Sequence, residues 1–519
     1  MEFRHKVRSG EDSVRTSDMH ASRKSDGGIV SMKQANKGDQ SPKGDHALEE
    51  TVEKRPPAKR NSCQTTVTST QGLEATLSGL ARVREAAQKD SRLRFNNLLT
   101  HVTTDLLRRA FKSLKKQAAP GVDGVTWETY NEGLEGRLED LKDRIHSGRY
   151  RARPSERRWI PKPDGRKRPL GIAALEDKIV QQALAWIIQE IFEADFLGFS
   201  YGFRPGKSAH NALDALYVAI TQRKVNWVLD ADVRSFFDNI EHEWLMKFLE
   251  HRVTDSRVLR LVRKFLRAGV LEEGEWSRTV AGTAQGAVIS PLLANIYLHY
   301  VLDLWVNMRR KQVRGEVYIV RYADDFVMGF QYKADAEEFL EQMRKRFAKF
   351  GLELHDVKTR LIEFGRFANS NRRSRGEGKA ETFDFLGFTH ICTTRRKNGS
   401  FTLRRRTISK RLRAKVKEVR EVLNRNMHVP VPKQGKWIRA VVQGYFNYHA
   451  VPGNQQALQA FRTQVIRAWM WTLRRRSQKG RSLTWDNMQK LIKSWIPNVR
   501  VLHPYPNQRL RVGLKAGAG

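Results

Sequence analysis

Two adjacent aspartates, Asp324 and Asp325, interrupt the apolar stretch "EVYIVRYADDFVMGF" at residues 316–330. The residues on both sides alternate and are rich in β-branched side chains, a pattern that predicts two strands joined by a tight turn. Two like charges at the tip of such a hairpin stay ionised only where cations face them. Any fold of this chain must therefore bring positive charge to this turn.

A third carboxylate, Asp232, stands at the end of another predicted strand in "VNWVLDADVRSFFDNI" at residues 225–240. If the two strands are neighbours, the carboxylates converge, and oxygen ligands without His or Cys nearby favour Mg²⁺ over zinc. Two Mg²⁺ ions ~3.5–4 Å apart would suit nucleotidyl transfer, because they activate an attacking hydroxyl and stabilise the leaving pyrophosphate oxygen. Strand alternation alone does not choose Asp232 over its competitors Asp230 and Asp238.

The charge of the chain indicates the kind of partner it binds. It has 95 Lys and Arg against 56 Asp and Glu, a net charge of +39, which predicts salt-sensitive association with a polyanion, nucleic acid above all. Its two cysteines, Cys63 and Cys392, exclude a disulfide framework or a cysteine zinc site and suit a reducing compartment. No apolar stretch approaches the ~20 residues that cross a bilayer, and no secretory signal is evident. We therefore expect a cytoplasmic protein without a membrane partner.

The remaining patterns predict a mixed α+β chain. Residues 1–72 are rich in Ser, Lys, Gly, Asp and Thr and are predicted to be disordered. From residue 400 the sequence is basic and helical, which places a boundary near residue 395. Between them we expect a basic hairpin at 160–172, a buried helix around 179–191, a Gly-rich loop opening a long helix at 282–305, a helix capped by Asp335 with Glu338 in a capping box, and one short strand at 382–390.

The order of these motifs resembles a known family. "RYADDFV" resembles the active-site hairpin of reverse transcriptases, "DADVRSFFDNI" the strand of their other catalytic aspartate, and "AQGAVISPLLANIYL" their template-and-nucleotide loop. The forms "SYGFRPGKSAHNALDAL", "GLELHDVKTRLIEFGRFA" and "TFDFLGFTH" resemble the reverse transcriptase–maturases encoded by bacterial group II introns. The likeness extends over about residues 72–510.

The resemblance implies a right-hand polymerase fold. Fingers and palm, with an antiparallel sheet, would occupy residues 73–395, an α-helical thumb and maturase domain residues 396–482, and a short extension residues 483–519. We expect most aromatics of the thumb region to belong to its core rather than to stack on bases; these are Tyr445, Phe446, Trp469 and Trp471.

The resemblance also assigns roles to single residues. Asp232, Asp324 and Asp325 would be the catalytic metal ligands, which resolves the choice that alternation leaves open. Phe237 would exclude a ribose 2′-OH by steric clash. The other implied contacts are Lys162 and Arg168 with the triphosphate, Gln285 with the incoming nucleotide, Lys358 as proton donor to pyrophosphate, Tyr201 and Arg204 at the template strand, and Arg404, Arg405, Arg406, Arg474, Arg475 and Arg476 with RNA. The family has Pro before the loop glutamine, whereas this chain has Ala284, which loosens the loop.

By the same resemblance, the activity would be RNA-directed DNA synthesis with two Mg²⁺ ions, combined with maturase binding of intron RNA to assist splicing and mobility. The partners would be intron RNA, an RNA template with a DNA primer, dNTPs and target DNA, in a ribonucleoprotein of the bacterial cytoplasm. Without a cysteine pair near the end of the sequence, we expect no endonuclease activity. The alternatives are a domesticated relative in phage defence or DNA repair, a splicing cofactor with a relic active site, and an RNA-copying RNA polymerase.

Overall fold

The computed structural model describes residues 68–161, 167–272, 275–277, 281–283 and 286–509. By compactness these fall into two units: an N-terminal unit that ends at residue 368 and also includes residue 509, and a C-terminal unit of residues 369–508. Of residues 1–72, which were expected to be disordered, 1–67 lie outside the described residues, but 68–72 form the start of helix α1 (Thr68–Lys89), so the expectation was wrong there. The turn of the expected basic hairpin also lies outside the described residues. No helix within the described ranges is long and apolar enough to cross a membrane.

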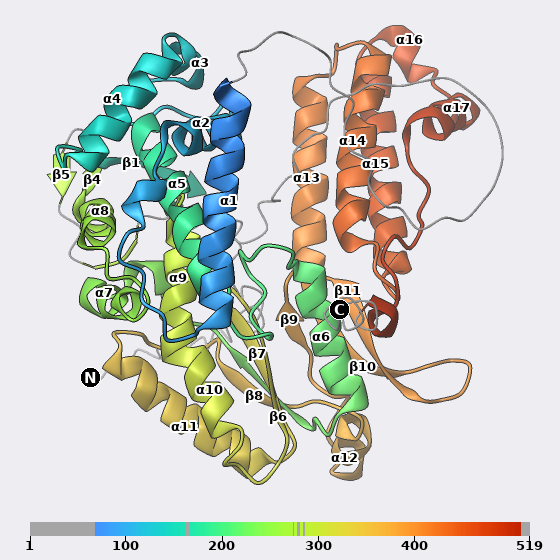
Figure 1. The fold of residues 1–519 in the computed structure, drawn as a ribbon. Helices are drawn as coiled ribbons and strands as arrows, with labels where there is room; N and C mark the ends of the chain where they lie inside the picture. The colour runs from blue at the N-terminus through green and yellow to red at the C-terminus, as the bar shows by residue number, and fades with distance from the viewer. Residues whose placement is uncertain (1–67, 162–166, 273–274, 278–280, 284–285, 510–519) are drawn as a thin grey trace, which may run out of the picture. The chain divides into compact units, whose positions relative to one another are not determined.

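Helices form most of the N-terminal unit (Figure 1). The expected buried helix is confirmed as α5, which packs against α1 and α2 with its apolar side chains in the core. The helices of this unit are α1 (Thr68–Lys89), α2 (Thr104–Ser113), α3 (Trp127–Asn131), α4 (Leu134–His146), α5 (Leu175–Phe192), α6 (Ala209–Gln222), α7 (His242–Glu250), α8 (Ser256–Arg267), α9 (Ser290–Leu298), α10 (Leu304–Arg309) and α11 (Lys333–Lys349), with short 3-10 turns η1 (Leu99–His101) and η2 (Phe236–Asp238).

The expected long helix after the Gly-rich loop is interrupted. Between α9 and α10 the chain forms a π turn, η3 (His299–Asp303), with one wider turn of helix. Such turns are rare, occur mostly within α-helices and are frequent at functional sites. The side chains of His299 and Asp303 in this turn are buried.

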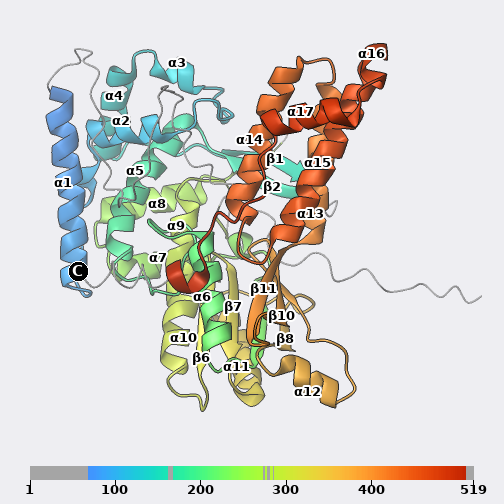
Figure 2. The same cartoon turned by 90° about the vertical axis from the view of Figure 1, so that its right-hand side faces the viewer.

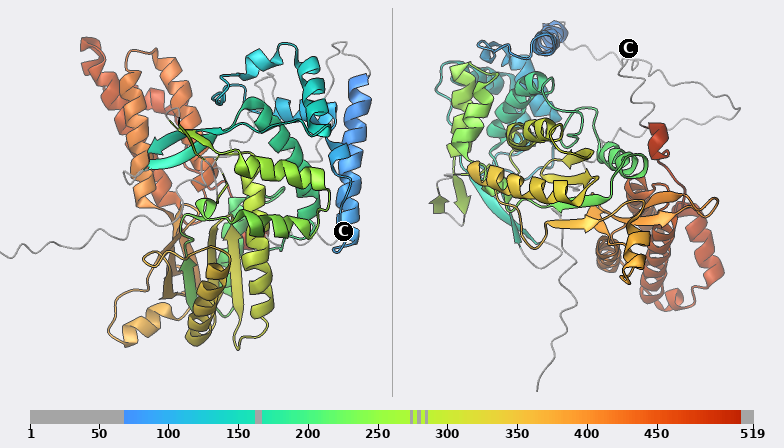
Figure 3. Two further views of the ribbon diagram at one scale, coloured as in Figure 1. Left: turned by 90° about the vertical axis from the view of Figure 1, so that its left-hand side faces the viewer. Right: turned by 90° about the horizontal axis from the view of Figure 1, so that it is seen from below.

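A four-stranded antiparallel sheet lies at the centre of the unit, in the order β6-β7-β3-β8. Its strands are β3 (Trp227–Ala231), β6 (Val317–Tyr322), β7 (Asp325–Phe330) and β8 (Arg360–Glu363). The expected hairpin is confirmed, since Tyr322 pairs with Asp325 across a two-residue turn. All six residues of β7 are buried, because neighbouring strands flank it on both sides and helix α11 packs along one face (Figure 3).

A second sheet has the order β2-β1-β4-β5. The expected basic hairpin is confirmed as β1 (Ser155–Pro161) paired with β2 (Lys167–Ile172), and β4 (Val270–Glu272) runs parallel to β1 while β5 (Glu275–Ser277) pairs with β4.

The C-terminal unit combines a small sheet with a bundle of helices (Figure 2). Helices α13, α14 and α15 run side by side and share one apolar core with α17. Its elements are α12 (Ala368–Ser374), β9 (Phe383–Phe385), β10 (Phe388–Thr394), β11 (Phe401–Thr407), α13 (Ser409–Arg425), α14 (Val431–His449), α15 (Gln455–Arg475), α16 (Gln478–Arg481) and α17 (Trp485–Trp495). The sheet order is β11-β10-β9, and β10 and β11 lie on either side of residue 395.

Two further local expectations were wrong. Residues 382–390 form two strands rather than one, because Leu386 and Gly387 both adopt positive φ, 45° and 83°, and turn the chain back. Helix α11 begins at Lys333, after Tyr332, so Asp335 does not cap it. Its carboxylate instead accepts a hydrogen bond of 2.8 Å from the Gly315 amide, a contact distant in sequence.

Candidate active site

The strand register brings the predicted carboxylates to one end of the central sheet. Strands β3 and β7 pair antiparallel up to Ala231 and Phe326, so Asp232 follows opposite Asp325. Asp324 lies beside it, in the turn between β6 and β7. The two strands that carry the carboxylates are therefore neighbours, which was the condition for the carboxylates to converge.

Positive charge reaches this end of the sheet through Lys358. Its Nζ lies 2.9 Å from Oδ2 of Asp232, whose side chain is 12% exposed. The loop that carries Lys358 is fixed to the end of β3, because the His355 amide donates 2.8 Å to the Asp232 carbonyl. Asp232 and Lys358 were both predictable from the sequence, but their direct contact depends on this loop and is visible only in the structure.

The competing carboxylates have different surroundings. Asp230 is fully buried within β3, and its carboxylate lies 3.9 Å from the guanidinium of Arg360 on β8. Asp238 is exposed in the short turn η2. Of the candidates, Asp232 is the one whose backbone lies opposite Asp325 at the end of the sheet.

The chemistry of the donors fits a hard cation. Asp232, Asp324 and Asp325 offer carboxylate oxygens, the ligands that Mg²⁺ prefers. In the structure the ammonium of Lys358 contacts one of these oxygens. Within the described ranges, no three His, Cys, Asp or Glu side chains are grouped closely enough to be recognised as a metal site.

Phe237 lies in η2, the next element after β3, beyond the segment 232–235. Its ring is partly buried and packs edge-to-face on Phe236, with centroids 5.3 Å apart. Its carbonyl accepts a 2.8 Å hydrogen bond from the Thr283 amide in the Gly-rich loop. A side chain on Gly282 would lie 2.8 Å from the same carbonyl, so only glycine allows this close approach. The loop that precedes Gln285 is thus fixed against the Phe237 segment.

Several predicted nucleotide contacts cannot be placed. Lys162 and Gln285 lie outside the described residues, as does Ala284, which precedes Gln285. Arg168 is in β2, where it pairs with Ile160, and its side chain is likewise outside them.

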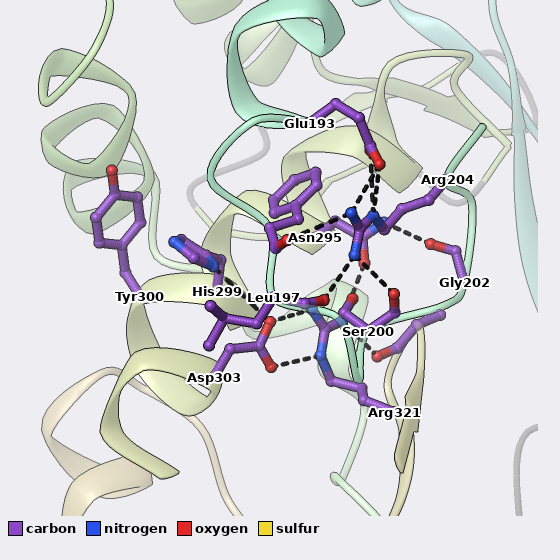
Figure 4. A network of polar contacts seen from close by, with 12 residues as sticks. Glu193, Leu197, Ser200, Gly202, Arg204, Asn295, His299, Tyr300, Asp303 and Arg321 are labelled. Carbon is purple, nitrogen blue, oxygen red and sulfur yellow. Dashed lines mark hydrogen bonds and ion pairs between the residues drawn. The ribbon is translucent and has the colours of Figure 1, made fainter. Parts of the chain in front are cut away.

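A buried polar network around Arg321 (Figure 4) contacts the turn that holds Asp324, because Arg321 bonds to the Ala323 carbonyl. Arg321, on β6, donates to both carboxylate oxygens of Asp303, and both side chains are fully buried. Asn295 of α9 accepts a hydrogen bond from Arg321 and donates one to the carbonyl of Gly202. None of these side chains was predictable as part of the site, since nothing in the local sequence pattern shows that they meet.

Arg204 and Tyr201 belong to the segment that lies against this turn. The guanidinium of Arg204 is buried and bonds to Glu193 and to the carbonyls of Leu197 and Ser200. The Tyr201 amide donates 2.9 Å to the Arg321 carbonyl. Arg204 therefore holds the fold of its own segment.

His299 lies beside this network in the π turn. Burial lowers the pKa of His299 to about 4, and the nearby Asp303 raises it only in part. The imidazole is consequently neutral at physiological pH and adds no further positive charge beside Arg321.

The predicted RNA-binding arginines differ in exposure. Side chains alternate along β11, so Arg406 is exposed whereas Arg405 is buried, at 1% exposure. Arg404 bonds to Gln456. At the end of α15, Arg474 and Arg475 are exposed and Arg476 is partly exposed.

Most of the aromatics that were expected to belong to a helical core are buried in the C-terminal unit. Trp469 is buried and donates to Gln434, and Tyr445 and Phe446 are buried among the helices. Trp471 is the exception: it is exposed, with the guanidinium of Arg475 4.3 Å from its ring centroid.

Comparison with known proteins identifies the family. A family model described as reverse transcriptase (RNA-dependent DNA polymerase) matches residues 160–390. Protein YkfC of Escherichia coli K12 is 36% identical over 292 residues, which cover 50% of this chain and 77% of that protein. The group II intron-encoded protein LtrA of Lactococcus lactis is 31% identical over 245 residues, 46% of this chain and 41% of LtrA. Nuclear intron maturase 1 of Arabidopsis thaliana is 29% identical over 92 residues, 18% of this chain and 13% of that protein.

This chain belongs to the reverse transcriptase family, among the relatives of group II intron-encoded proteins and intron maturases. The resemblance stated from the sequence is thereby confirmed. The match with LtrA covers less than half of that protein's length.

Proposed function

We propose that the chain is an RNA-directed DNA polymerase that adds dNTPs to a primer 3′-OH by two-metal catalysis, and that it binds an intron RNA as a maturase. The observation that carries the proposal is the position of Asp232 opposite Asp325, with Asp324 in the adjoining turn, in a member of the reverse transcriptase family.

In this proposal Asp232, Asp324 and Asp325 hold two Mg²⁺ ions. When bound, these ions activate the primer hydroxyl and stabilise the leaving pyrophosphate oxygen. Lys358, already adjacent to Asp232, gives a proton to pyrophosphate. Phe237 lies beneath the sugar, and Gln285 contacts the incoming nucleotide while Lys162 and Arg168 hold its triphosphate.

We assign fingers and palm to residues 73–395, thumb and maturase domain to 396–482 and a short extension to 483–519. Structured RNA and the template–primer duplex bind basic surface on the thumb, where Arg406, Arg474 and Arg475 are exposed. Arg204 supports the template strand by fixing its own segment rather than by direct contact. The proposed partners are intron RNA and target DNA, in a bacterial cytoplasmic ribonucleoprotein.

The direct test is extension of a DNA primer on an RNA template by the purified protein with dNTPs and Mg²⁺. We expect full-length DNA, no product when EDTA is present, and RNA binding that weakens steeply with salt. Tight RNA binding without extension, in either Mg²⁺ or Mn²⁺, would refute the polymerase and leave a splicing cofactor.

Sugar selection is expected to depend on Phe237. Replacing it with alanine removes the ring that blocks a 2′-OH, so the preference for dNTPs over NTPs should fall at least about tenfold. Competitive single-nucleotide incorporation measures this ratio. The exposed Phe367 provides a matched control, since Phe367→Ala should leave the ratio unchanged. An unaltered ratio in Phe237→Ala would show that another group selects the sugar.

Proton donation by Lys358 is tested with two substitutions. Lys358→Met should lower kcat by about a hundredfold. Lys358→Arg keeps positive charge beside Asp232 but should stay nearly as slow, because a guanidinium does not release its proton. Single-turnover kinetics of nucleotide addition give these rates. Lys345→Met, which breaks an exposed pair with Glu341, is the control. Full recovery in Lys358→Arg would reduce the role of Lys358 to that of a counter-charge.

A further inference from the structure

The turn that carries Asp324 has an unfavourable backbone conformation. Ala323, its first residue, has φ of 57°, a left-handed conformation that a residue with a Cβ rarely adopts. Such conformations persist where the surrounding structure enforces them. The contacts of this turn therefore determine where the Asp324 carboxylate lies.

Arg321 reaches directly to the turn. Its Nη1 donates to the Ala323 carbonyl at 3.0 Å and to Oδ1 of Asn295 at 2.9 Å. Its Nε and Nη2 donate to Oδ1 and Oδ2 of Asp303, at 2.7 and 2.5 Å. Asp303 and Asn295 together hold the planar guanidinium in one orientation. The hydrogen bond from Arg321 to the Ala323 carbonyl therefore has a fixed geometry.

The segment around Gly202 packs against the other side of this turn. The backbone of Gly202 lies so close that a Cβ there would be 2.2 Å from the Ala323 nitrogen. Asn295 Nδ2 holds this glycine by a 2.7 Å bond to its carbonyl. The backbone of Arg321 bonds to Phe199 and Tyr201 on the same segment, at 2.9 Å each. One buried side chain, Asn295, therefore links Arg321 to the segment that covers the turn (Figure 4).

We propose that Arg321, Asn295 and Asp303 form a positioning unit that fixes the Ala323–Asp324 turn and so sets the rate of nucleotide addition. This inference rests on the proposed polymerase function. The three side chains are buried and act through the turn, so they are not expected to touch substrate. Their loss should lower kcat while KM for dNTPs and the Kd for template–primer stay nearly constant.

The principal test compares two buried arginines. Arg321→Lys keeps a positive charge beside Asp303 but loses the fork geometry. Arg252→Lys makes the same change in a similar setting, because Arg252 is buried, paired with Asp195 and bonded to the backbone carbonyls of Ser91 and Leu93, with no bond to the turn. We expect similar losses of thermal stability, a 10- to 100-fold lower kcat for Arg321→Lys only, and KM within threefold for both.

A readout that needs no activity separates the two proposals. Hydrogen exchange of the peptide containing residues 322–325 should become faster in Arg321→Lys and stay unchanged in Arg252→Lys. Equal exchange and equal kcat in the two variants would overturn the positioning unit. A wild-type protein that extends no primer, but whose turn exchanges faster in Arg321→Lys, would overturn the polymerase and leave the positioning unit intact.

Asn295→Ala serves if Arg321→Lys fails to fold. It removes the link between Arg321 and Gly202 and leaves the Arg321–Asp303 ion pair in place. We expect kcat to fall about tenfold and exchange at the turn to rise. Unchanged kcat and exchange would refute the proposal.

Discussion

Replacing Asp324 with asparagine is expected to lower the rate of RNA-templated primer extension by at least about a thousandfold. The substitution keeps the size of the side chain and removes one negative charge from the end of the sheet where Asp232 and Asp325 also lie. A ligand that orients a catalytic cation contributes several kcal/mol to transition-state stabilisation, and about 4 kcal/mol corresponds to a factor of a thousand. This loss is measured by comparing the rates of single-nucleotide addition by the variant and the wild type at saturating dNTP.

The control for this experiment is Asp238→Asn. Asp238 is an exposed carboxylate six residues after Asp232, outside the sheet end, and its loss should change the rate no more than about twofold. Template–primer binding, followed by fluorescence anisotropy, should be similar for all three proteins. A rate for Asp324→Asn within tenfold of wild type would remove Asp324 from the catalytic centre.

The second large effect concerns stability. Asp303→Ala leaves the fully buried guanidinium of Arg321 without its carboxylate. Breaking a buried ion pair by removing one partner typically costs about 3–5 kcal/mol, so we expect the thermal midpoint of unfolding to fall by roughly 10 °C. Circular dichroism at 222 nm follows the transition. Glu250→Ala, which breaks an exposed pair with Arg263, is the control and should shift the midpoint by no more than about 2 °C.

The double variant Arg321→Met with Asp303→Leu separates charge burial from positioning. Replacing both charges with apolar groups of similar volume should recover most of the stability. It does not restore the bond to the Ala323 carbonyl, so extension should remain slow. Recovery of both stability and rate would show that the ion pair serves folding alone.

Local sequence pattern was sufficient for the elements that carry the carboxylates. The hairpin around Asp324 was predictable because alternation, β-branching and a polar tip coincide within fifteen residues. Local pattern did not show that β3 lies beside β7; that pairing was implied by the family resemblance, which rests on the order of the motifs. The contact of Lys358 with Asp232 joins residues 126 positions apart, and residue type alone could not show it.

The features that could not be predicted from the sequence depend on contacts between residues far apart in the chain. The local sequence pattern predicts that Asp335 caps a helix. Its carboxylate instead accepts a hydrogen bond from the Gly315 amide, which is twenty residues away in sequence and comes close only in the folded chain. Leu386 adopts a positive φ that its residue type disfavours, because the paired strands β9 and β10 require it. Arg321, Asn295 and Asp303 are spread over separate elements, and their charges become interpretable only once they are seen to be buried together.

The π turn between α9 and α10 has a consequence for how this helix can change in evolution. Asn295 and Asp303 are eight residues apart, and in a regular α-helix they would point about 80° away from each other around the axis. The wider turn at His299–Asp303 rotates less per residue, which brings both side chains toward Arg321. Straightening this turn without changing its length would separate the two side chains by that angle, whereas deleting one residue would place them seven residues apart and within about 20° of each other in a regular helix. The length of this segment and the width of its turn should therefore change only together.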